Sequence, residues 1–355
     1  MPAPPPPPLP KAFAHALPTW RAAYSDRTAA MMAYFAELAY VPFVDDTPRP
    51  APGEKRPEEA GGWESLQNLI EPGGFEVVAT FNKDNVQAFL ALNPGELAVL
   101  AFRGTANLAD WGINLNAILR PMPGFPGVEV HTGFWDTFHD LNGRPEEHMA
   151  NVIKAAVDKY TSEPELGLYI TGHSLGGALA QVASAVLERD NLAACYTFGS
   201  PRVGTLNFDR VVKCPHYRAV DDWDLVPGVP TPWPWGGYLH SGDPRLLKGK
   251  LPKLPSEALR RDQDVLPRFF HYIWSFLVWP FLRTLTIIDD HMIWNYRKRL
   301  DHIAELRAED EIKAATVDLD TKDAAAKALA AVVAVTASPP PKPRALRKRP
   351  PKAPA

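Results

Sequence analysis

A stretch near the middle of the chain constrains the fold more than any other, because a strand, a sharp turn and a helix are predicted in direct succession. Residues 168–171 form an apolar run typical of a buried strand, and residues 178–187 have the composition of a helix. The turn between them is Gly172-His173-Ser174-Leu175-Gly176. A tight turn puts its apical residue into a strained conformation and excludes bulk two positions to either side, where the two glycines stand.

This setting predicts that Ser174 is a nucleophile. The free N–H groups at the start of the following helix, with its positive dipole end, are suited to stabilise a negative oxygen. The alternative is a glycine-rich turn with an unreactive serine. We expect His173, inside the turn, to be a packing residue that fixes it.

Apolar strands and helical stretches alternate from residue 75 to residue 238, which favours an α/β sheet that is mostly parallel. The strand candidates are Phe75–Phe81, Gln87–Leu92, Leu97–Phe102, Leu168–Thr171, Ala194–Phe198 and Tyr217–Val220. The helix candidates are Asp26–Tyr40 (with Asp26 as a candidate cap), Leu108–Leu119, Glu146–Tyr160, Gly176–Arg189 and Asn207–Val212.

Composition divides the chain of 355 residues into one main domain and its extensions. We expect a proline-rich, disordered leader over 1–18, a domain over 19–300 with a surface loop at 45–62, an Ala- and charge-rich helical extension over 301–337, and a basic, proline-rich, disordered tail over 338–355. The proline-rich start does not look like a signal peptide, so a cytoplasmic or peripheral membrane location is expected. The formal charge of −3 gives no electrostatic case for nucleic-acid binding.

The two cysteines, Cys195 and Cys214, allow at most one disulfide. Because Cys195 lies in a buried-strand pattern, a free core thiol is expected. The sequence has no HExxH motif and no paired Cys/His spacing, so neither a metal nor another cofactor is expected.

A serine nucleophile needs a base to accept its proton and an acid to orient that base. In this kind of fold both follow the serine in the chain. Three candidate acids, Asp221, Asp222 and Asp224, follow a predicted strand end, and His240 and His291 are the candidate bases.

Five motifs occur in an order that resembles the class 3 lipases, the family of the filamentous-fungal triacylglycerol lipases. They are Ala101-Phe102-Arg103-Gly104-Thr105, His131-Thr132-Gly133-Phe134, the turn at 172–180, Thr197-Phe198-Gly199-Ser200-Pro201-Arg202-Val203-Gly204, and Asp224-Leu225-Val226-Pro227-Gly228-Val229-Pro230. The match covers about residues 26–238 and resumes near 289–300. It implies an α/β-hydrolase fold, with a mostly parallel central sheet flanked by helices.

The resemblance also assigns roles. It implies Asp224 as the acid and His291 as the base, with His240 structural, and it leaves Asp221 and Asp222 as solvated loop carboxylates. The oxyanion hole would consist of Thr105 and the backbone N–H of Leu175. His131 is expected to form hydrogen bonds within the core.

Leu108, Trp111 and Leu115 fall on one face of the helix predicted after Thr105. In the family the matching segment is a lid that opens on a lipid surface. The alternative is an ordinary amphipathic helix packed on the core.

Residues 240–288 are an insertion, first proline-rich and then aromatic. Its part 269–288 is long enough to span a membrane, but acid and base would then lie on opposite sides of the bilayer. With Pro280 in its middle, the segment is expected to be a shallow interfacial anchor or an acyl-binding wall. A core helix is the alternative.

The sequence thus predicts a carboxylic ester hydrolase, a triacylglycerol lipase working through an acyl-enzyme. Its partner would be a lipid ester at a lipid–water interface, with peripheral membrane contact through 269–288 and the basic tail. The alternatives are a phospholipase A1, a small-ester esterase, or a non-catalytic binding module on a hydrolase shell.

Overall fold

The structure, a computed structural model, describes twelve stretches of the chain. They are residues 9–10, 23–41, 61–83, 86–105, 118–139, 148–163, 165–187, 189–222, 224–230, 237–247, 259–260 and 291–317. In 61–65, 259–260 and 312–317 only the backbone is described. The predicted lid helix up to residue 117, the segment 269–288 and the basic tail lie outside these residues.

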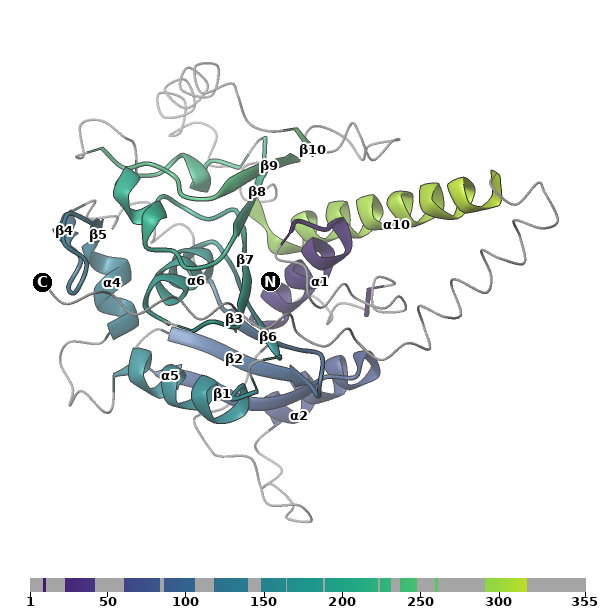
Figure 1. The fold of residues 1–355 in the computed structure, drawn as a ribbon, viewed down its shortest axis with the longest axis horizontal. Helices are drawn as coiled ribbons and strands as arrows, with labels where there is room; N and C mark the ends of the chain where they lie inside the picture. The colour runs from purple at the N-terminus through teal and green to yellow at the C-terminus, as the bar shows by residue number, and fades with distance from the viewer. Residues whose placement is uncertain are drawn as a thin grey trace, which may run out of the picture. The chain divides into compact units, whose positions relative to one another are not determined.

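The described residues form a central eight-stranded sheet with the order β1-β2-β3-β6-β7-β8-β9-β10 (Figure 1). Neighbouring strands from β3 to β9 are parallel, whereas β1-β2, β2-β3 and β9-β10 are antiparallel. The strands are β1 (Glu76–Lys83), β2 (Val86–Asn93), β3 (Leu97–Phe102), β6 (Gly167–His173), β7 (Leu192–Phe198), β8 (His216–Asp221), β9 (Asp243–Leu247) and β10 (Leu259–Arg260). The predicted mostly parallel sheet is therefore confirmed, and the six predicted strands are present with ends within two residues.

Helices cover both faces of the sheet, and the buried side chains form two clusters accordingly. One face packs against α1 (Asp26–Leu38), α2 (Gly61–Ile70) and α10 (Ile293–Val317). The other packs against α4 (Thr132–His139), α5 (Met149–Tyr160) and α6 (Leu175–Val186). Strand β3 is buried throughout, as expected for a strand covered on both faces: Val99 belongs to the first cluster and Leu100 to the second.

Several predicted details differ from the structure. Helix α1 is capped by the Ser25 side chain, which accepts a hydrogen bond from the N–H of Thr28, and not by Asp26. The resemblance implies a strand over the motif His131-Thr132-Gly133-Phe134, but the strand ends at His131 and residues 132–134 begin α4. The predicted helix over Asn207–Val212 is a short 3-10 turn, η4 (Leu206–Arg210). Residues 61–62 begin α2, so the predicted surface loop ends earlier.

A small two-stranded sheet lies beside the main one. It consists of β4 (Leu119–Pro121) and β5 (Glu129–His131), and Leu119, expected at the end of a helix, is the first residue of β4. Isolated bridges continue it from Val130 to Gly204 and from Gly204 to Leu239. These bridges tie the chain after β7 to the small sheet.

Helix α10 passes through residue 300, where we expected the domain to end. Leu300, Ile303 and Ala304 are buried in the cluster that contains α1, so the compact unit continues to Arg307. Arg297 pairs with Glu37, and Arg307 pairs with Asp26 at 3.0 Å. Two ion pairs therefore join α10 to α1, one near each end of α1.

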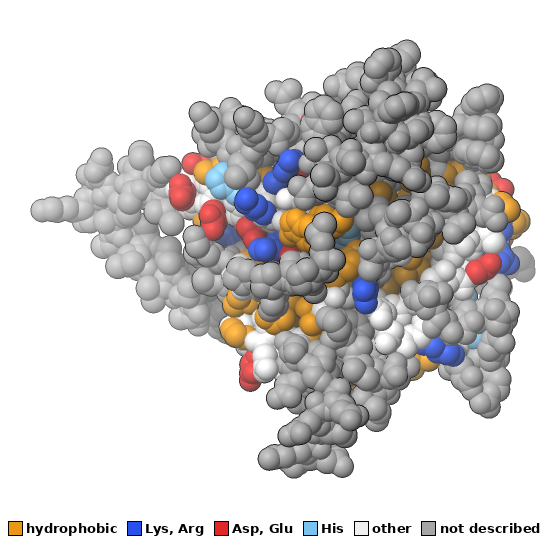
Figure 2. Space-filling view, turned by 180° about the vertical axis from the view of Figure 1, so that it is seen from behind, with side chains coloured by type: hydrophobic (Ala, Val, Ile, Leu, Met, Phe, Trp, Pro, Cys, Tyr) orange, Lys and Arg blue, Asp and Glu red, His pale blue; other side chains and the backbone are white. Residues whose placement is uncertain are grey.

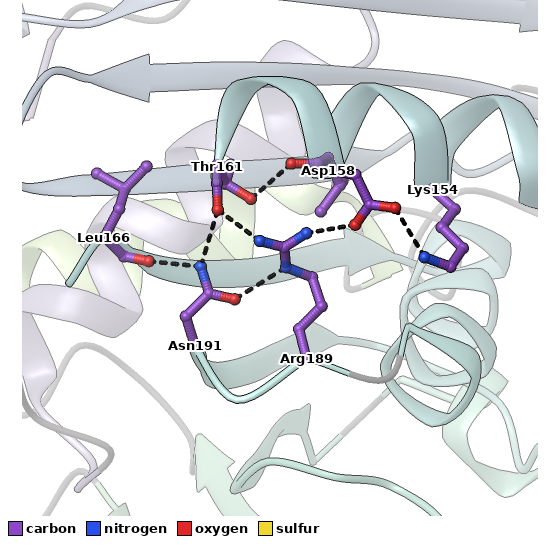
Figure 3. A network of polar contacts seen from close by, with 7 residues as sticks. Lys154, Asp158, Thr161, Leu166, Arg189 and Asn191 are labelled. Carbon is purple, nitrogen blue, oxygen red and sulfur yellow. Dashed lines mark hydrogen bonds and ion pairs between the residues drawn. The ribbon is translucent and has the colours of Figure 1, made fainter. Parts of the chain in front are cut away.

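A polar network fixes the loops at the amino ends of β6 and β7 (Figure 3). Arg189 donates hydrogen bonds to Asp158, to the carbonyl of Thr161 and to Asn191. Asn191 in turn donates to the carbonyl of Leu166 at 2.8 Å, one residue before β6. Because β6 and β7 are parallel, the opposite edge of the sheet holds their carboxyl ends, where Ser174 lies.

The surface of the described residues carries a few large apolar side chains. Seen from behind, hydrophobic side chains are visible in the middle of the face, with charged ones around them (Figure 2). The exposed large hydrophobic residues are Ile118, Leu206, Leu239 and Trp294. Within the described residues, no helix is both long and apolar enough to cross a bilayer. Cys195 and Cys214 are free, and Cys195 is buried, as predicted.

Candidate active site

Ser174 lies at the junction of β6 and α6 in a strained backbone conformation. Its φ of 57° and ψ of −127° make it the one non-glycine residue of the described chain with a positive φ. Its N–H donates to the carbonyl of Phe198 at 3.0 Å, which ties the turn to the end of β7. Such strain costs of order 1–3 kcal/mol and persists where the surrounding structure enforces it, commonly at active sites.

The glycines of the turn are required by close backbone contacts. A Cβ on Gly172 would lie 2.2 Å from the carbonyl oxygen of Gly176. A Cβ on Gly176 would lie 2.3 Å from the carbonyl oxygen of Phe102, at the end of β3. The expectation that no bulk fits at these two positions is therefore confirmed, and the second glycine also lets β3 approach the turn.

The two residues predicted to form the oxyanion hole lie at the edge of the sheet that holds Ser174. Leu175 is the first residue of α6, where backbone N–H groups lack an acceptor within the helix. Thr105, which is half-buried, follows Gly104, and a Cβ on Gly104 would lie 2.6 Å from the carbonyl oxygen of His173 and 3.1 Å from the Cβ of Ser174. The segment that carries Thr105 thus packs directly on the turn, and the roles of both residues stay predictions.

Asp224 and His291 form a buried pair. The Nδ1 of His291 lies 2.8 Å from Oδ2 of Asp224, and their exposed fractions are 1% and 7%. Because a carboxylate only accepts hydrogen bonds, Nδ1 carries the hydrogen and donates it. Nε2 is then the nitrogen left to accept a proton, and it is buried without a hydrogen-bond partner among the described residues, Ser174 included. Catalytic hydrogen bonds often form fully only with substrate present.

Two further groups orient the carboxylate of Asp224. Its Oδ1 accepts a hydrogen bond from the N–H of Val226 at 2.9 Å, and its Oδ2 accepts one from the hydroxyl of Tyr296 at 2.5 Å. Burial, and next the charge of Asp224, raise the pKa of Tyr296 well above its usual value. The tyrosine is therefore a neutral donor, and Asp224 accepts three hydrogen bonds in all.

Gly199 brings the serine turn and this pair together. It follows Phe198, whose carbonyl accepts the N–H of Ser174, and it has a φ of +56°. A Cβ on Gly199 would lie 2.6 Å from Oδ2 of Asp224 and 3.1 Å from the ring of His291. Only a glycine therefore leaves room for the pair beside the end of β7.

His173 connects the turn to His291 and to the turn that follows α1. Its Nε2 lies 2.6 Å from the carbonyl oxygen of His291, so Nε2 carries the hydrogen. Its Nδ1 lies 2.7 Å from the hydroxyl of Tyr40 and accepts that hydrogen bond. Burial, and next His291, hold the pKa of His173 well below its usual value, so the ring is neutral. The expectation that His173 fixes the turn agrees with these contacts.

The alternative bases and acids lie elsewhere. The Nε2 of His240 contacts the carbonyl oxygen of Pro227 at 2.7 Å, which fixes η5 (Val226–Gly228) after Asp224. His131 accepts a hydrogen bond from the N–H of Phe134 at 3.3 Å within the core, as expected. Asp221 corrects the prediction of a solvated carboxylate: it is 1% exposed and pairs with Arg299 at 2.7 Å. Asp222 is half-buried.

Sequence reasoning missed Tyr296 and Arg299. The resemblance to the class 3 lipases implies an aromatic helix after His291, but nothing in the sequence indicates which of its side chains reaches Asp224. The lid candidates Leu108, Trp111 and Leu115 lie outside the described residues. In the part that the structure describes, no group of three His, Cys, Asp or Glu side chains is arranged to hold a metal ion.

Part of the chain is similar in sequence to known proteins. Residues 99–233 match the family model described as Lipase (class 3). A secreted mono- and diacylglycerol lipase 1 from Fusarium solani is 35% identical over 172 residues, which cover 47% of this chain and 49% of the relative. Phospholipase A1-Igamma1 (chloroplastic) from Arabidopsis thaliana is 30% identical over 192 residues, which cover 46% of this chain and 36% of the relative. The aligned part thus spans half or less of these curated relatives.

Among solved structures, a mutant form of MDLA from Penicillium cyclopium aligns with a TM-score of 0.51 at 20% identity, covering 68% of this chain and 86% of that chain. This likeness bears on the fold alone. Together with the mostly parallel sheet flanked by helices, it establishes the predicted α/β-hydrolase fold.

Proposed function

We propose that this chain, whose residues 99–233 belong to the class 3 lipase family, hydrolyses carboxylic esters of lipids with Ser174 as its nucleophile. The observation that carries the proposal is the buried pair of His291 and Asp224 beside the strained turn that holds Ser174. A serine hydroxyl becomes a useful nucleophile only where a base accepts its proton. In the proposed mechanism, Nε2 of His291 is that base.

In the first half of the reaction, the Oγ of Ser174 attacks the ester carbonyl and its proton passes to Nε2 of His291. The carboxylate of Asp224 holds the ring and stabilises the imidazolium. The tetrahedral intermediate carries its negative charge on the former carbonyl oxygen, which accepts hydrogen bonds from the N–H of Leu175 and from Thr105. The intermediate collapses, the alcohol leaves with the proton from His291, and an acyl-enzyme remains.

In the second half, water attacks the acyl-enzyme while Nε2 of His291 accepts one of its protons. A second tetrahedral intermediate forms in the same oxyanion site. Its collapse releases the fatty acid and returns the proton to Ser174, so the overall reaction consumes one water for each ester bond.

The substrates proposed first are acylglycerols at a lipid–water interface. The name of the Fusarium solani relative supports mono- and diacylglycerols, and we extend the proposal to triacylglycerols. A phospholipase A1 is the second candidate, because the name of the Arabidopsis thaliana relative gives that activity at similar identity. A lid over Leu108, Trp111 and Leu115 and a membrane contact through 269–288 and the basic tail are parts of this proposal.

The test measures fatty-acid release from emulsified tri-, di- and monoacylglycerols and from phosphatidylcholine vesicles. Ser174→Ala should abolish release, whereas Ser184→Ala, a buried serine farther along α6, should retain it. A wild-type protein that binds the vesicles and hydrolyses none of these esters would identify a binding module instead. A jump in rate once the substrate forms an interface would support the lid, and smooth saturation would count against it.

A further inference from the structure

A second buried carboxylate lies beside the proposed catalytic pair. Asp221 ends β8, and its backbone carbonyl accepts a hydrogen bond from the N–H of Asp224 at 3.3 Å. Its side chain is buried and forms an ion pair with Arg299 of α10, with 2.7 Å between nitrogen and oxygen. A buried carboxylate of this kind is stable where an opposite charge compensates it. Arg299 provides that charge.

Helix α10 connects this ion pair to the catalytic pair. His291 lies just before α10, and Tyr296 and Arg299 are three residues apart, on neighbouring positions of one helix face. The hydroxyl of Tyr296 accepts the N–H of Asp221 at 3.0 Å and donates to Oδ2 of Asp224 at 2.5 Å. Arg299 also donates to the carbonyl of Leu247, at the end of β9, at 3.4 Å. One short stretch of helix thus contacts the ends of two strands and the acid.

The groups around the catalytic pair come from several elements. They are Tyr40, in the turn after α1, with Arg103 above its ring, His173 of β6, Asp221 at the end of β8 with Asp222 after it, and Tyr296 and Arg299 of α10. His173 is neutral, and burial raises the pKa of both tyrosines, so they are neutral as well. Arg103 is bonded to Gln87 and is partly exposed, and Asp222 is half-buried, so water screens both more strongly. Asp221 is therefore the buried charge that these contacts place beside the pair, and Arg299, whose side chain is 19% exposed, is its ion-pair partner.

We propose that Arg299 is a positioning residue of the active site, which neutralises Asp221 beside the catalytic pair and holds α10, and with it His291, against the end of β8. The inference rests on the proposed function. It assigns to Arg299 an electrostatic effect on catalysis without contact with the substrate. The sign of this electrostatic effect is defined. Loss of Arg299 leaves an uncompensated negative charge near His291, whereas loss of Asp221 leaves an uncompensated positive charge there.

These opposite signs make the inference measurable. The acid limb of the profile of kcat/KM against pH reports protonation of the base. A nearby negative charge favours the imidazolium, so the limb in Arg299→Gln should move to higher pH, by about half a unit or more. Asp221→Asn should move it to lower pH by a similar amount. The double variant Asp221→Asn/Arg299→Gln removes both charges and should return the limb close to its wild-type position.

The experiment measures this profile with a soluble p-nitrophenyl ester, and in parallel the rate of inactivation by a fluorophosphonate across the same pH range. Arg299→Lys, which keeps the positive charge, should restore the wild-type limb. The control is Arg307→Gln, because Arg307 lies on the same helix, α10, and forms an ion pair with Asp26 of α1, although its own side chain is more exposed than that of Arg299. It should lower the unfolding temperature without moving the limb.

The inference is overturned if the two single variants leave the limb unmoved or shift it in the same direction, or if Arg307→Gln shifts it as much. If Arg299→Gln does not fold, Asp221→Asn and the double variant still decide the sign. A wild-type protein that neither hydrolyses the ester nor reacts with the probe overturns the proposed function and this inference together. An active wild type with unmoved limbs overturns this inference alone.

Discussion

Gly199→Ala is the substitution for which the structure gives the clearest expected effect. The new Cβ would lie 2.6 Å from Oδ2 of Asp224 and 3.1 Å from the ring of His291. Favourable contacts between heavy atoms lie near 3.5 Å, so the carboxylate or the backbone must move on the order of 1 Å. A displacement of that size at a reacting centre costs about 100-fold in rate. We therefore expect kcat/KM to fall about 100-fold.

The same substitution also strains the backbone, and this effect must be separated from the first. Gly199 has a φ of +56°, a region that costs a residue with a Cβ roughly 1–2 kcal/mol. Gly95 is the matched control, because it has a φ of +74° and nothing lies within 4 Å of its would-be Cβ. Gly95→Ala should lose a similar free energy of unfolding and keep its activity.

The assay measures kcat/KM with a soluble p-nitrophenyl ester, and the free energy of unfolding by urea denaturation followed by circular dichroism. The expected result is a large loss of activity in Gly199→Ala at a stability close to that of Gly95→Ala. Activity of Gly199→Ala within threefold of the wild type would refute the reasoning. An equal loss in both variants would show that strain, and not contact with the pair, accounts for the effect.

Three further changes have defined outcomes. Tyr296→Phe removes a hydrogen bond to the carboxylate of Asp224. A bond to a charged group contributes roughly 1.5–3 kcal/mol, so we expect kcat/KM to fall about 10- to 100-fold, and an unchanged value would contradict this. His173→Leu leaves the buried carbonyl of His291 without its hydrogen-bond donor, so stopped-flow and steady-state assays should show a fall in kcat with little change in KM. A raised KM at unchanged kcat would exclude a positioning role for His173. Burial raises the pKa of the Asp301 carboxyl from 3.8 to about 6, so the folded state binds the carboxyl proton more tightly than the unfolded state does. The bound proton therefore stabilises the folded state fully below pH 4, and this stabilisation is lost as the pH rises through 6. Asp301→Asn should lack this decline in urea titrations between pH 4 and 6, and an identical slope in both proteins would contradict the assignment.

The elements that the sequence predicted well are those whose signal is local. The turn around Ser174 is set by its own glycines and by the strand and helix that adjoin it. The apolar run of β3 fixes a strand that is covered on both faces, and the structure reproduces its bounds from Leu97 to Phe102. These features depend on residues within about ten positions of one another, so a pattern is sufficient to find them.

The acid illustrates where local signals end. Asp221 and Asp224 stand three positions apart after the same strand, and their surroundings in the sequence do not distinguish a buried ion pair from a catalytic carboxylate. Asp221 is buried because Arg299, 78 positions later, compensates it, as the ion pair between them shows. The prediction of a solvated Asp221 was wrong for this reason.

Gly199 and Tyr296 show the same limit. The lack of room for a side chain at Gly199 follows from the approach of Asp224 and His291, which come from two later segments of the chain. Tyr296 lies on a helix whose aromatic character was evident, but its contact with Asp224 depends on how α10 packs against α1. Tertiary packing, not local propensity, decides both.

The central claim, that Ser174 is the activated nucleophile of the site, is tested most directly by mapping a covalent label. Wild-type protein would be treated with a fluorophosphonate, digested, and analysed by mass spectrometry. The account predicts one adduct per chain, on Ser174, with no adduct in Ser174→Ala and strongly slowed labelling in His291→Ala. Absence of labelling in the wild type, or equal labelling of Ser174→Ala, would contradict it.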